Sequence, residues 1–197
     1  MIDIFPAIGQ IAKSKPTIKG GILDSYLVIS ALGEDRPGIV NKLSMAIYDS
    51  HCNIVDSRMS VLGGEFAIIL MVSGNEKDIS ALEASLPDSQ ASLGLTIITR
   101  KTDQRRSQTN VVPYNAKAIA IDNPGIVYQI ANFFSNRNIN IENLSTESYA
   151  APHTGTPMFA LDLNVNIPSD INISDLREDF FTFCDELNID AALEPMK

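Results

Sequence analysis

Asp35-Arg36-Pro37-Gly38-Ile39-Val40 is repeated 87 residues later as Asp122-Asn123-Pro124-Gly125-Ile126-Val127. Five apolar positions from Ile39 onward are matched by five at the same offset, and the register also pairs Asn53 with Asn140 and Asp56 with Asn143. A match of this length without a gap indicates an internal duplication. The sequence therefore predicts two copies of one small domain.

The first copy begins with a β-rich apolar run over residues 26–32, followed by a helix. Pro37 suits the first position of that helix, where its missing N–H costs nothing, and Ile39 begins the apolar face. We expect this helix to end near His51. A tight turn at Gly63-Gly64 then joins the next two strands in a hairpin.

A second helix, opened by Asn75, completes the copy; we expect Pro87 to stop it and residues 93–99 to form the closing strand. The second copy repeats this order, with a longer hairpin connection over 146–157 and Ser174 as the N-cap of its last helix. The predicted fold class is therefore α+β, with two ferredoxin-like βαββαβ domains, each an antiparallel sheet with its helices on one face.

The length of the chain agrees with two domains. With 197 residues, 45% of them hydrophobic, each half can bury a core of its own. We predict an N-terminal extension over residues 1–23, domains over 24–100 and 113–197, and a linker over 101–112. The apolar residues of the extension could pack on the body or on a partner, or stay loosely packed.

Charge disfavours one class of partner. The formal net charge is -9, and both predicted domains are acidic. Only residues 1–21 and the linker lean basic, each by two charges. Because this is too little for a phosphate-binding surface, we expect no direct contact with nucleic acid.

The reactive side chains form no recognisable catalytic pattern. Cys52 and Cys184 stand in no disulfide or metal-binding spacing, which is typical of a reducing compartment, so we expect a cytoplasmic protein. His51 and His153 have no partners at ligand spacing, and no nucleophile motif is visible. The apolar runs are only as long as strands, so we predict no membrane span. We also predict no cofactor, no metal and no catalytic residue.

The repeated turn is the first candidate for ligand binding. A strand that enters a helix through a short turn presents the first helical N–H groups to an anion. We expect Gly38 and Gly125 to be the second residues of their helices, where the missing Cβ lets a carboxylate approach the backbone. Asn123 would also cap its helix, whereas Arg36 is a poor cap. Pro and Gly as simple helix-start residues are the alternative.

Polar residues at the start of the second strand form the other half of the candidate site. We expect Asn53 and Asp56, like Asn140 and Asn143, to lie near the end of the first loop. A helix N-terminus that faces amides or carboxylates suits the zwitterion of an amino acid. For Asn53 and Asn140 the alternative is a left-handed residue that ends the preceding helix.

Two βαββαβ units, each with Asp-x-Pro-Gly-Ile-Val after the first strand and Asn-Ile opening the second, resemble tandem ACT domains, which are amino-acid-sensing modules. Residues 26–40, 52–58 and 62–66 further resemble the family of bacterial glycine cleavage system transcriptional repressors. The resemblance implies a cytoplasmic regulator that responds to glycine. It also implies repression through a LysR-type DNA-binding activator, without operator contact.

Carried over by position, the resemblance implies an effector site near the first loop. The implied residues are Asp35, Arg36, Pro37, Gly38, Ile39, Asn53 and Asp56 in the first copy, and Asp122, Asn123, Pro124, Gly125, Ile126, Asn140 and Asn143 in the second. The copies differ electrostatically, because Asn123 replaces Arg36 and Asn143 replaces Asp56. From the sequence we favour the first copy as the sensor.

A second function and a second assembly remain open. ACT modules also serve as regulatory parts of enzymes, so the alternative is a detached regulatory subunit of an amino-acid or one-carbon enzyme. Two such units in one chain either satisfy each other's sheet edges or leave an edge for a homodimer.

Overall fold

A computed structural model gives the structure of the chain and describes residues 25–104 and 109–196. The predicted extension over residues 1–23 lies outside the described residues. The chain divides into two compact units at Arg105 and Arg106. The first unit contains β1 (Ser25–Glu34), α1 (Ile39–Asp49), β2 (Asn53–Leu62), β3 (Glu65–Gly74), α2 (Glu76–Leu93) and β4 (Thr96–Thr102). The second contains β5 (Val111–Ile121), α3 (Ile126–Ser135), β6 (Asn140–Ala150), β7 (Pro157–Pro168), α4 (Ile173–Glu186) and β8 (Asp190–Pro195).

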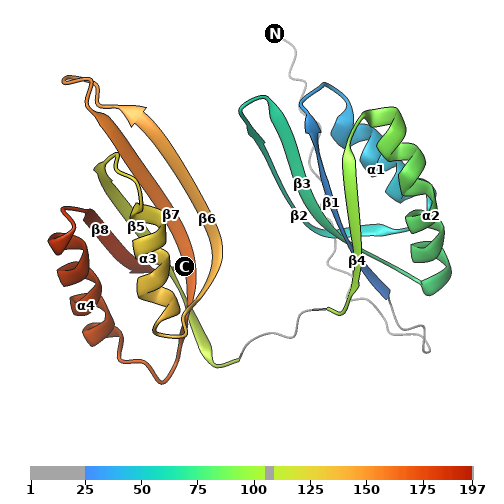
Figure 1. Cartoon of the computed structure of the whole chain (residues 1–197). Helices are drawn as coiled ribbons and strands as arrows, with labels where there is room; N and C mark the ends of the chain where they lie inside the picture. The colour runs from blue at the N-terminus through green and yellow to red at the C-terminus, as the bar shows by residue number, and fades with distance from the viewer. Residues whose placement is uncertain (1–24, 105–108, 197) are drawn as a thin grey trace, which may run out of the picture. The chain divides into compact units, whose positions relative to one another are not determined.

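Each unit is one antiparallel four-stranded sheet with two helices on one face (Figure 1). The strand order is β2-β3-β1-β4 in the first unit and β6-β7-β5-β8 in the second. The first and third strands of each unit pair at the centre, with Ser25 opposite Gly74 and Glu34 opposite Glu65 in the first. This is the ferredoxin-like βαββαβ arrangement, so the predicted fold class is confirmed.

The core of the first unit is mainly aliphatic. Alternate residues of β1 and β3 point toward the helices, and Leu27, Ile29 and Val72 are completely buried there. Leu43 and Ile47 of α1 close the same core from the helix side. Buried residues recur at every second position along the strands and about every 3.6 positions along the helices, and they therefore form one layer between the sheet and the helices.

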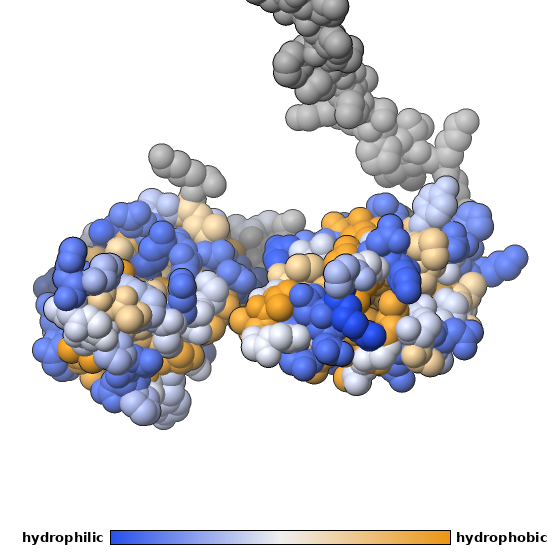
Figure 2. Space-filling model, turned by 90° about the horizontal axis from the view of Figure 1, so that it is seen from above, coloured by the Kyte–Doolittle hydropathy of each residue, from blue (hydrophilic) through white to orange (hydrophobic). Residues whose placement is uncertain are grey.

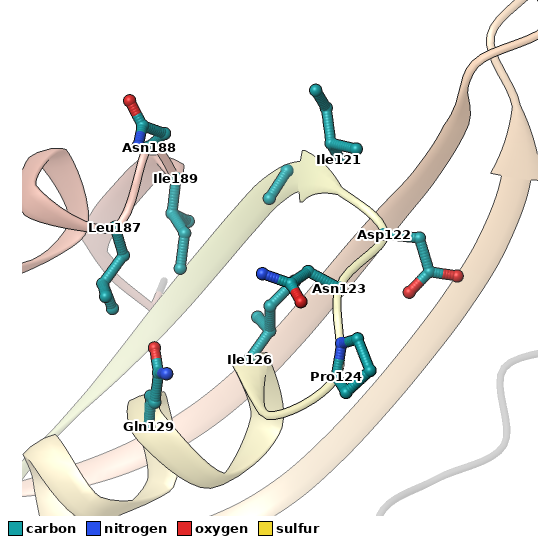
Figure 3. Close-up of a pocket in the computed structure, with 10 residues that line it drawn as sticks. Ile121, Asp122, Asn123, Pro124, Ile126, Gln129, Leu187, Asn188 and Ile189 are labelled. Carbon is teal, nitrogen blue, oxygen red and sulfur yellow. The ribbon is translucent and has the colours of Figure 1, made fainter.

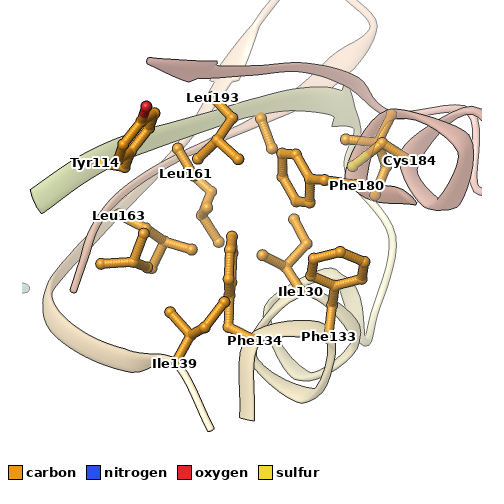
Figure 4. Close-up of a cluster of buried hydrophobic side chains, with 14 of the residues drawn as sticks. Tyr114, Ile130, Phe133, Phe134, Ile139, Leu161, Leu163, Phe180, Cys184 and Leu193 are labelled. Atoms are coloured by element: carbon orange, nitrogen blue, oxygen red, sulfur yellow. The ribbon is translucent and has the colours of Figure 1, made fainter. Parts of the chain in front are cut away.

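The core of the second unit uses aromatic rings in place of part of this aliphatic packing. Phe134 and Phe180, each 0% exposed, lie with their ring centroids 5.3 Å apart between the helices and the sheet (Figure 4). Phe133 packs against both, at 5.3 Å and 5.2 Å. Cys184 of α4 belongs to the same buried cluster.

The duplicated turn is held in the same way in both units. The backbone N–H of Asp35 donates to the carbonyl of Gly64 in the β2–β3 turn at 2.9 Å, and that of Asp122 donates to the carbonyl of Pro157 at 3.0 Å. Each bond fastens the loop after the first strand to the start of the third strand. The loop therefore leaves the sheet at a fixed place before the helix begins.

The helix starts differ from the prediction. Pro37 is not the first helical residue, since α1 begins at Ile39 with Gly38 as its N-cap at φ 93°, and α3 begins at Ile126 with Gly125 as its N-cap at φ 101°. Neither helix has a side-chain cap, so the expected cap by Asn123 is wrong. The left-handed φ favours glycine, and the helix starts directly after it, two residues later than predicted.

The second helix of the first unit is longer than predicted. Pro87 lies inside α2, which continues to Leu93 and ends at Gly94 with φ 65°. Leu86 and Leu93, both buried, lie seven residues apart on one face of this helix. Their burial favours continuation over the cost of the hydrogen bond that proline cannot make. The closing strand consequently begins at Thr96.

Two details of the second unit also differ from expectation. The N-cap of α4 is Asn172, whose Oδ1 accepts from the N–H of Ser174, so Ser174 lies inside the helix. The longer hairpin connection is confirmed but is narrower than residues 146–157, because β6 continues to Ala150 and β7 begins at Pro157, so residues 151–156 connect the strands where residues 63 and 64 do so in the first unit. By contrast, the predicted tight turn at Gly63-Gly64 is confirmed, with Leu62 paired to Glu65.

The stability of the second unit depends on its buried ring cluster. We expect Phe134→Ala to lower the free energy of unfolding by about 3–5 kcal/mol, because it leaves a cavity among rings that cannot close around it. Hydrogen exchange of the β5 and β7 amides in the full chain measures this loss. Tyr128→Ala is the control on the same helix, since Tyr128 is 73% exposed, and its effect should stay within about 0.5 kcal/mol. Equal protection in both variants would contradict this account of the core.

Candidate functional site

The residues of the two predicted loops differ in exposure. Residues 35–38 and 122–125 are exposed, whereas Ile39 and Ile126 are only 4% and 7% exposed and pack into the cores. Each isoleucine therefore anchors its helix to the sheet. The residues of each loop that are accessible to a ligand are the four that precede it.

The predicted residues of the second strand lie far from these loops. Asp56 pairs with Met71, which pairs with Val28, and the loop begins seven residues beyond Val28 along β1. At the rise of an extended strand this separation is about 20 Å. The prediction that Asp56 lies near the end of the first loop is wrong, because β1 and β2 both run antiparallel to β3 and so begin at the same end of the sheet.

The same separation holds in the second unit. Asn143 pairs with Asn164, which pairs with Asn115, seven residues before Asp122. Asn53 and Asn140 lie further still toward that end, opposite Ser73 and Asn166. The structure therefore does not bring the two halves of the predicted site together within either unit.

Asp56 and Asn140 make local contacts at the start of the second strand. The Asp56 carboxylate accepts from the backbone N–H of Ser57 at 2.8 Å and pairs with the guanidinium of Arg58. The Asn140 amide donates to the carboxylate of Glu142. A β-bulge precedes both Asp56 and Asn143. These contacts shape the edge of each sheet.

The left-handed conformation that was considered for Asn53 and Asn140 occurs two residues earlier. His51 and Asn138, which are equivalent positions, have φ 58° and 55°, while Asn53 and Asn140 are the first residues of β2 and β6. That alternative is therefore wrong.

Arg36 has a partner inside its own unit. Its guanidinium donates to the carbonyl of Leu93, the last residue of α2. It also lies over Gly94, where an added Cβ would come within 2.8 Å of Nη2. A cation at this place is favoured by the negative end of the helix dipole. Arg36 thus joins the first loop to the α2–β4 turn.

The second unit has a cavity beside the corresponding loop. A space of about 340 Å³ lies between residues 120–124, the first turn of α3 and the α4–β8 turn at Leu187, Asn188 and Ile189 (Figure 3). Asn188 is the counterpart of Gly94, because each is the left-handed residue that follows the second helix, at φ 55° and 65°. Asn123 replaces Arg36 and is shorter. The two copies therefore differ in the side chains beside this turn.

Three neutral amides line this cavity. Asn123 and Gln129 point into it, and Asn188 lies across from them, whereas the Asp122 carboxylate points away on the other side of the loop (Figure 3). The first unit has Arg36 and Lys42 in place of Asn123 and Gln129 by register, and Gly94 in place of Asn188 as the left-handed residue after the second helix. Sequence reasoning missed Gln129 and Asn188. The 87-residue register pairs Gln129 with Lys42, and a left-handed Asn is common after a helix.

The faces of the sheets away from the helices also differ between the copies. In the first unit this face carries exposed apolar side chains, with Leu32, Ile69 and Ile98 at 51%, 48% and 67% exposure. Apolar patches interrupt the hydrophilic surface of both units in the view of Figure 2. Several exposed apolar side chains on one face of a sheet are typical of a protein contact.

In the second unit the equivalent face is polar near its centre. The Asn115 amide donates to the carboxylate of Asp162 at 2.7 Å and to the side-chain oxygen of Asn164 at 2.9 Å. The Lys117 ammonium lies 3.9 Å from the other oxygen of Asp162. The copies therefore present different surfaces on the same scaffold.

Metal-binding clusters and reactive thiols were the two kinds of reactive group considered among the described residues. Within residues 25–104 and 109–196, no group of three or more His, Cys, Asp and Glu side chains could hold a metal ion. Burial raises the pKa of the Cys184 thiol to about 11. Burial and the neighbouring Asp78 carboxylate also raise the pKa of Cys52. Both thiols are therefore poor nucleophiles near neutral pH.

Comparison with known proteins identifies the family. The ACT domain model matches residues 25–99. The glycine cleavage system transcriptional repressor of Escherichia coli strain K12 is 30% identical over 168 residues, which are 85% of this chain and 88% of that protein. The chain belongs to this repressor family. Membership of the family gives the chain a regulatory role.

Solved structures agree with the repressor family. A crystal structure proposed to be a glycine cleavage system transcriptional repressor has a TM-score of 0.69 at 28% identity and covers 89% of this chain and 99% of its own. An unknown protein from Galdieria sulphuraria has a TM-score of 0.72 at 30% identity, with coverage of 89% and 100%. Both units therefore have counterparts among proteins of known structure. Among the described helices, none has the length and apolarity to cross a membrane.

The two thiols of this repressor-family chain should differ in reactivity. At about pH 8 we expect dithiobis-nitrobenzoate to modify Cys52, which is partly accessible, while Cys184, at 1% exposure and with its raised pKa, reacts only after unfolding. Absorbance should count one thiol in the native chain and two in guanidinium. Cys52→Ser is the control and should leave no reactive thiol in the native state. Rapid modification of both thiols in the native chain would show that the core around Cys184 is open.

Proposed function

We propose that this chain responds to a small amino acid, with glycine as the first candidate, and represses transcription of the glycine cleavage genes. The observation that carries the proposal is the 30% identity to the Escherichia coli repressor over 168 residues. An alignment of that length is longer than either unit, so it includes parts of both. The proposal therefore concerns the tandem arrangement and not a single module.

Repression is proposed to act through contact with a LysR-type DNA-binding activator. Two features support protein contact over direct DNA binding. The net charge of -9 opposes approach to a phosphate backbone. The apolar face of the first unit around Leu32, Ile69 and Ile98 offers a surface that an activator could cover.

The ligand is proposed to bind at the repeated loops. Residues 35–38 and 122–125 are accessible and directly precede a helix N-terminus, which favours a carboxylate. Ile39 and Ile126 contribute to the site by fixing the helices. A separate polar region lies at the opposite end of each sheet and is not proposed to contact the same ligand. It consists of Asn53 and Asp56 in the first unit and Asn140 and Asn143 in the second.

Affinity capture tests the partner. We expect the tagged full chain to recover a LysR-type activator, identified by mass spectrometry, from an extract of the organism that encodes it, with a recovery that changes when glycine is added. Ile98→Lys should lower this recovery at least about tenfold, because it places a charge in the apolar face. Tyr48→Lys is the matched control, since Tyr48 is 78% exposed on α1 and lies on the helix side of the sheet.

The other outcomes separate the alternatives. Recovery of an amino-acid or one-carbon enzyme in place of the activator would favour a detached regulatory subunit. Tight, salt-sensitive binding of the purified chain to promoter DNA would contradict the protein-contact mechanism and the charge argument together.

A further inference from the structure

The open face of the first sheet, which lies away from α1 and α2, carries an apolar row at its centre (Figure 1). The register places Ser30 of β1 between Ile69 of β3 and Ile98 of β4. Ile69 and Ile98 are half or more exposed, and so is Leu32, the next residue of β1 on this face. Exposed apolar side chains that gather on one face mark a surface that another segment covers.

The second unit does not repeat this row. The equivalent central residue of β5 is Lys117, which lies between Asp162 of β7 and Ala192 of β8. The Lys117 ammonium lies 3.9 Å from a carboxylate oxygen of Asp162. The shared scaffold therefore does not require an apolar row at this place, so folding alone does not explain the row in the first unit.

The residues that precede β1 supply an apolar segment of the same chain. Five of the first eleven residues are isoleucine or phenylalanine, namely Ile2, Ile4, Phe5, Ile8 and Ile11. The chain enters the first unit at Ser25, and β1 lies between β3 and β4 in the interior of the sheet. A segment attached there starts from the middle of the sheet and not from an edge.

We propose that residues 1–11 fold back over the open face of the first sheet and cover the apolar row at Ser30, Ile69 and Ile98. The occupant of the face is thus a segment of the same chain. The docking does not depend on the proposed function, and it gives residues 1–24 the role of a cover for this surface.

The connection is long enough for this arrangement. Thirteen residues lie between Ile11 and Ser25, and an extended chain of that length spans about 40 Å. Ser30 lies five residues along β1 from Ser25, which is about 17 Å. Gly20 and Gly21 lie within the connection, and glycine permits the tight turn that a reversal of the chain needs.

The helix side of the sheet is already occupied at the end where β1 begins. The hydroxyl of Ser25 donates to the carboxylate of Glu76, in the first turn of α2, at 2.7 Å. The Lys101 ammonium of β4 pairs with the same carboxylate. Further along β1, Leu27 and Ile29 are completely buried under the helices. The open face is therefore the side of this sheet on which an apolar segment can still bury surface.

Charge favours the same association. Residues 1–21 carry three lysines and one aspartate, whereas residues 25–100 carry nine acidic and five basic side chains. Opposite net charges attract the segment to the unit. The three lysines lie over residues 13–19, in the connection, so the apolar part carries only the charge of Asp3.

Alkylation of an introduced thiol measures whether the row is covered. Ser30→Cys places a thiol at the centre of the row and keeps its apolar side chains, in a full chain that also carries Cys52→Ser. The reagent is iodoacetamide, which is uncharged, and mass spectrometry follows the rate in the native state. We expect Phe5→Asp with Ile8→Asp to raise this rate at least about tenfold, because a carboxylate is costly to bury and the row is then uncovered for more of the time.

Two controls separate docking from charge and from folding. Ser14→Asp with Thr17→Asp adds the same charge to the connection, outside the apolar part, and should leave the thiol of Ser30→Cys protected. Ser44 is half-buried like Ser30 but lies on α1, on the helix side of the sheet. Ser44→Cys should therefore react at the same rate with either form of residues 1–11.

Three outcomes would overturn the proposal. One is an equal rate at Ser30→Cys with and without Phe5→Asp and Ile8→Asp. Another is protection that increases with protein concentration, since the cover would then be a second copy of the chain. The third is protection that Ser14→Asp with Thr17→Asp also removes, because charge and not apolar contact would then hold the segment.

The covered face is the one offered to the activator, so the segment and the activator would compete for it. This consequence, unlike the docking itself, rests on the proposed function. We expect Phe5→Asp with Ile8→Asp to raise recovery of the activator in affinity capture at least about threefold. Unchanged recovery would overturn the competition. No recovery with either form would overturn the proposed partner, and the alkylation rates would still decide the docking.

Discussion

The arrangement of each unit depends on how the chain leaves its first strand. A backbone hydrogen bond from Asp35 or Asp122 fastens the loop to the start of the third strand, and a left-handed glycine then reorients the chain before the helix starts. Only glycine adopts this conformation without steric cost. The isoleucine that follows is thereby directed into the core, and the residue two positions before the glycine is held near the turn between the second helix and the last strand. The length and charge of that side chain then determine whether it fills the space beside this turn.

Much of this could be predicted from the sequence, because the duplication shows the same pattern twice. The strand periods, the hairpin at Gly63-Gly64 and the βαββαβ order depend on local pattern and were predictable for that reason. The helix start was placed two residues early, since Pro37 suits a first turn and nothing local shows that Gly38 takes φ 93°. Local pattern also predicts that Pro87 ends α2, whereas the helix continues because Leu93, seven residues after Leu86, is buried by tertiary packing.

The candidate site was harder to predict, because it depends on which end of the sheet each residue occupies. Asn53 and Asp56 follow the first helix in sequence, yet the helix returns the chain to the other end of the sheet before β2 begins. Within the second unit, the structure instead brings the loop over residues 122–125 together with the α4–β8 turn, about sixty-five residues later in the sequence. Divergence between copies then becomes informative: Arg36 with Gly94 fills a space that Asn123 with Asn188 leaves open.

The central claim, as proposed above, is that the tandem units respond to a small amino acid that binds at the repeated loops. The most direct measurement is an amide-resolved nuclear magnetic resonance titration of the full chain with glycine. The account predicts saturable shifts of the backbone amides of residues 35–40, 122–127 or both, which form the repeated loops and the starts of the helices that follow them. Saturable shifts at neither loop, in a chain shown to be folded, would contradict it.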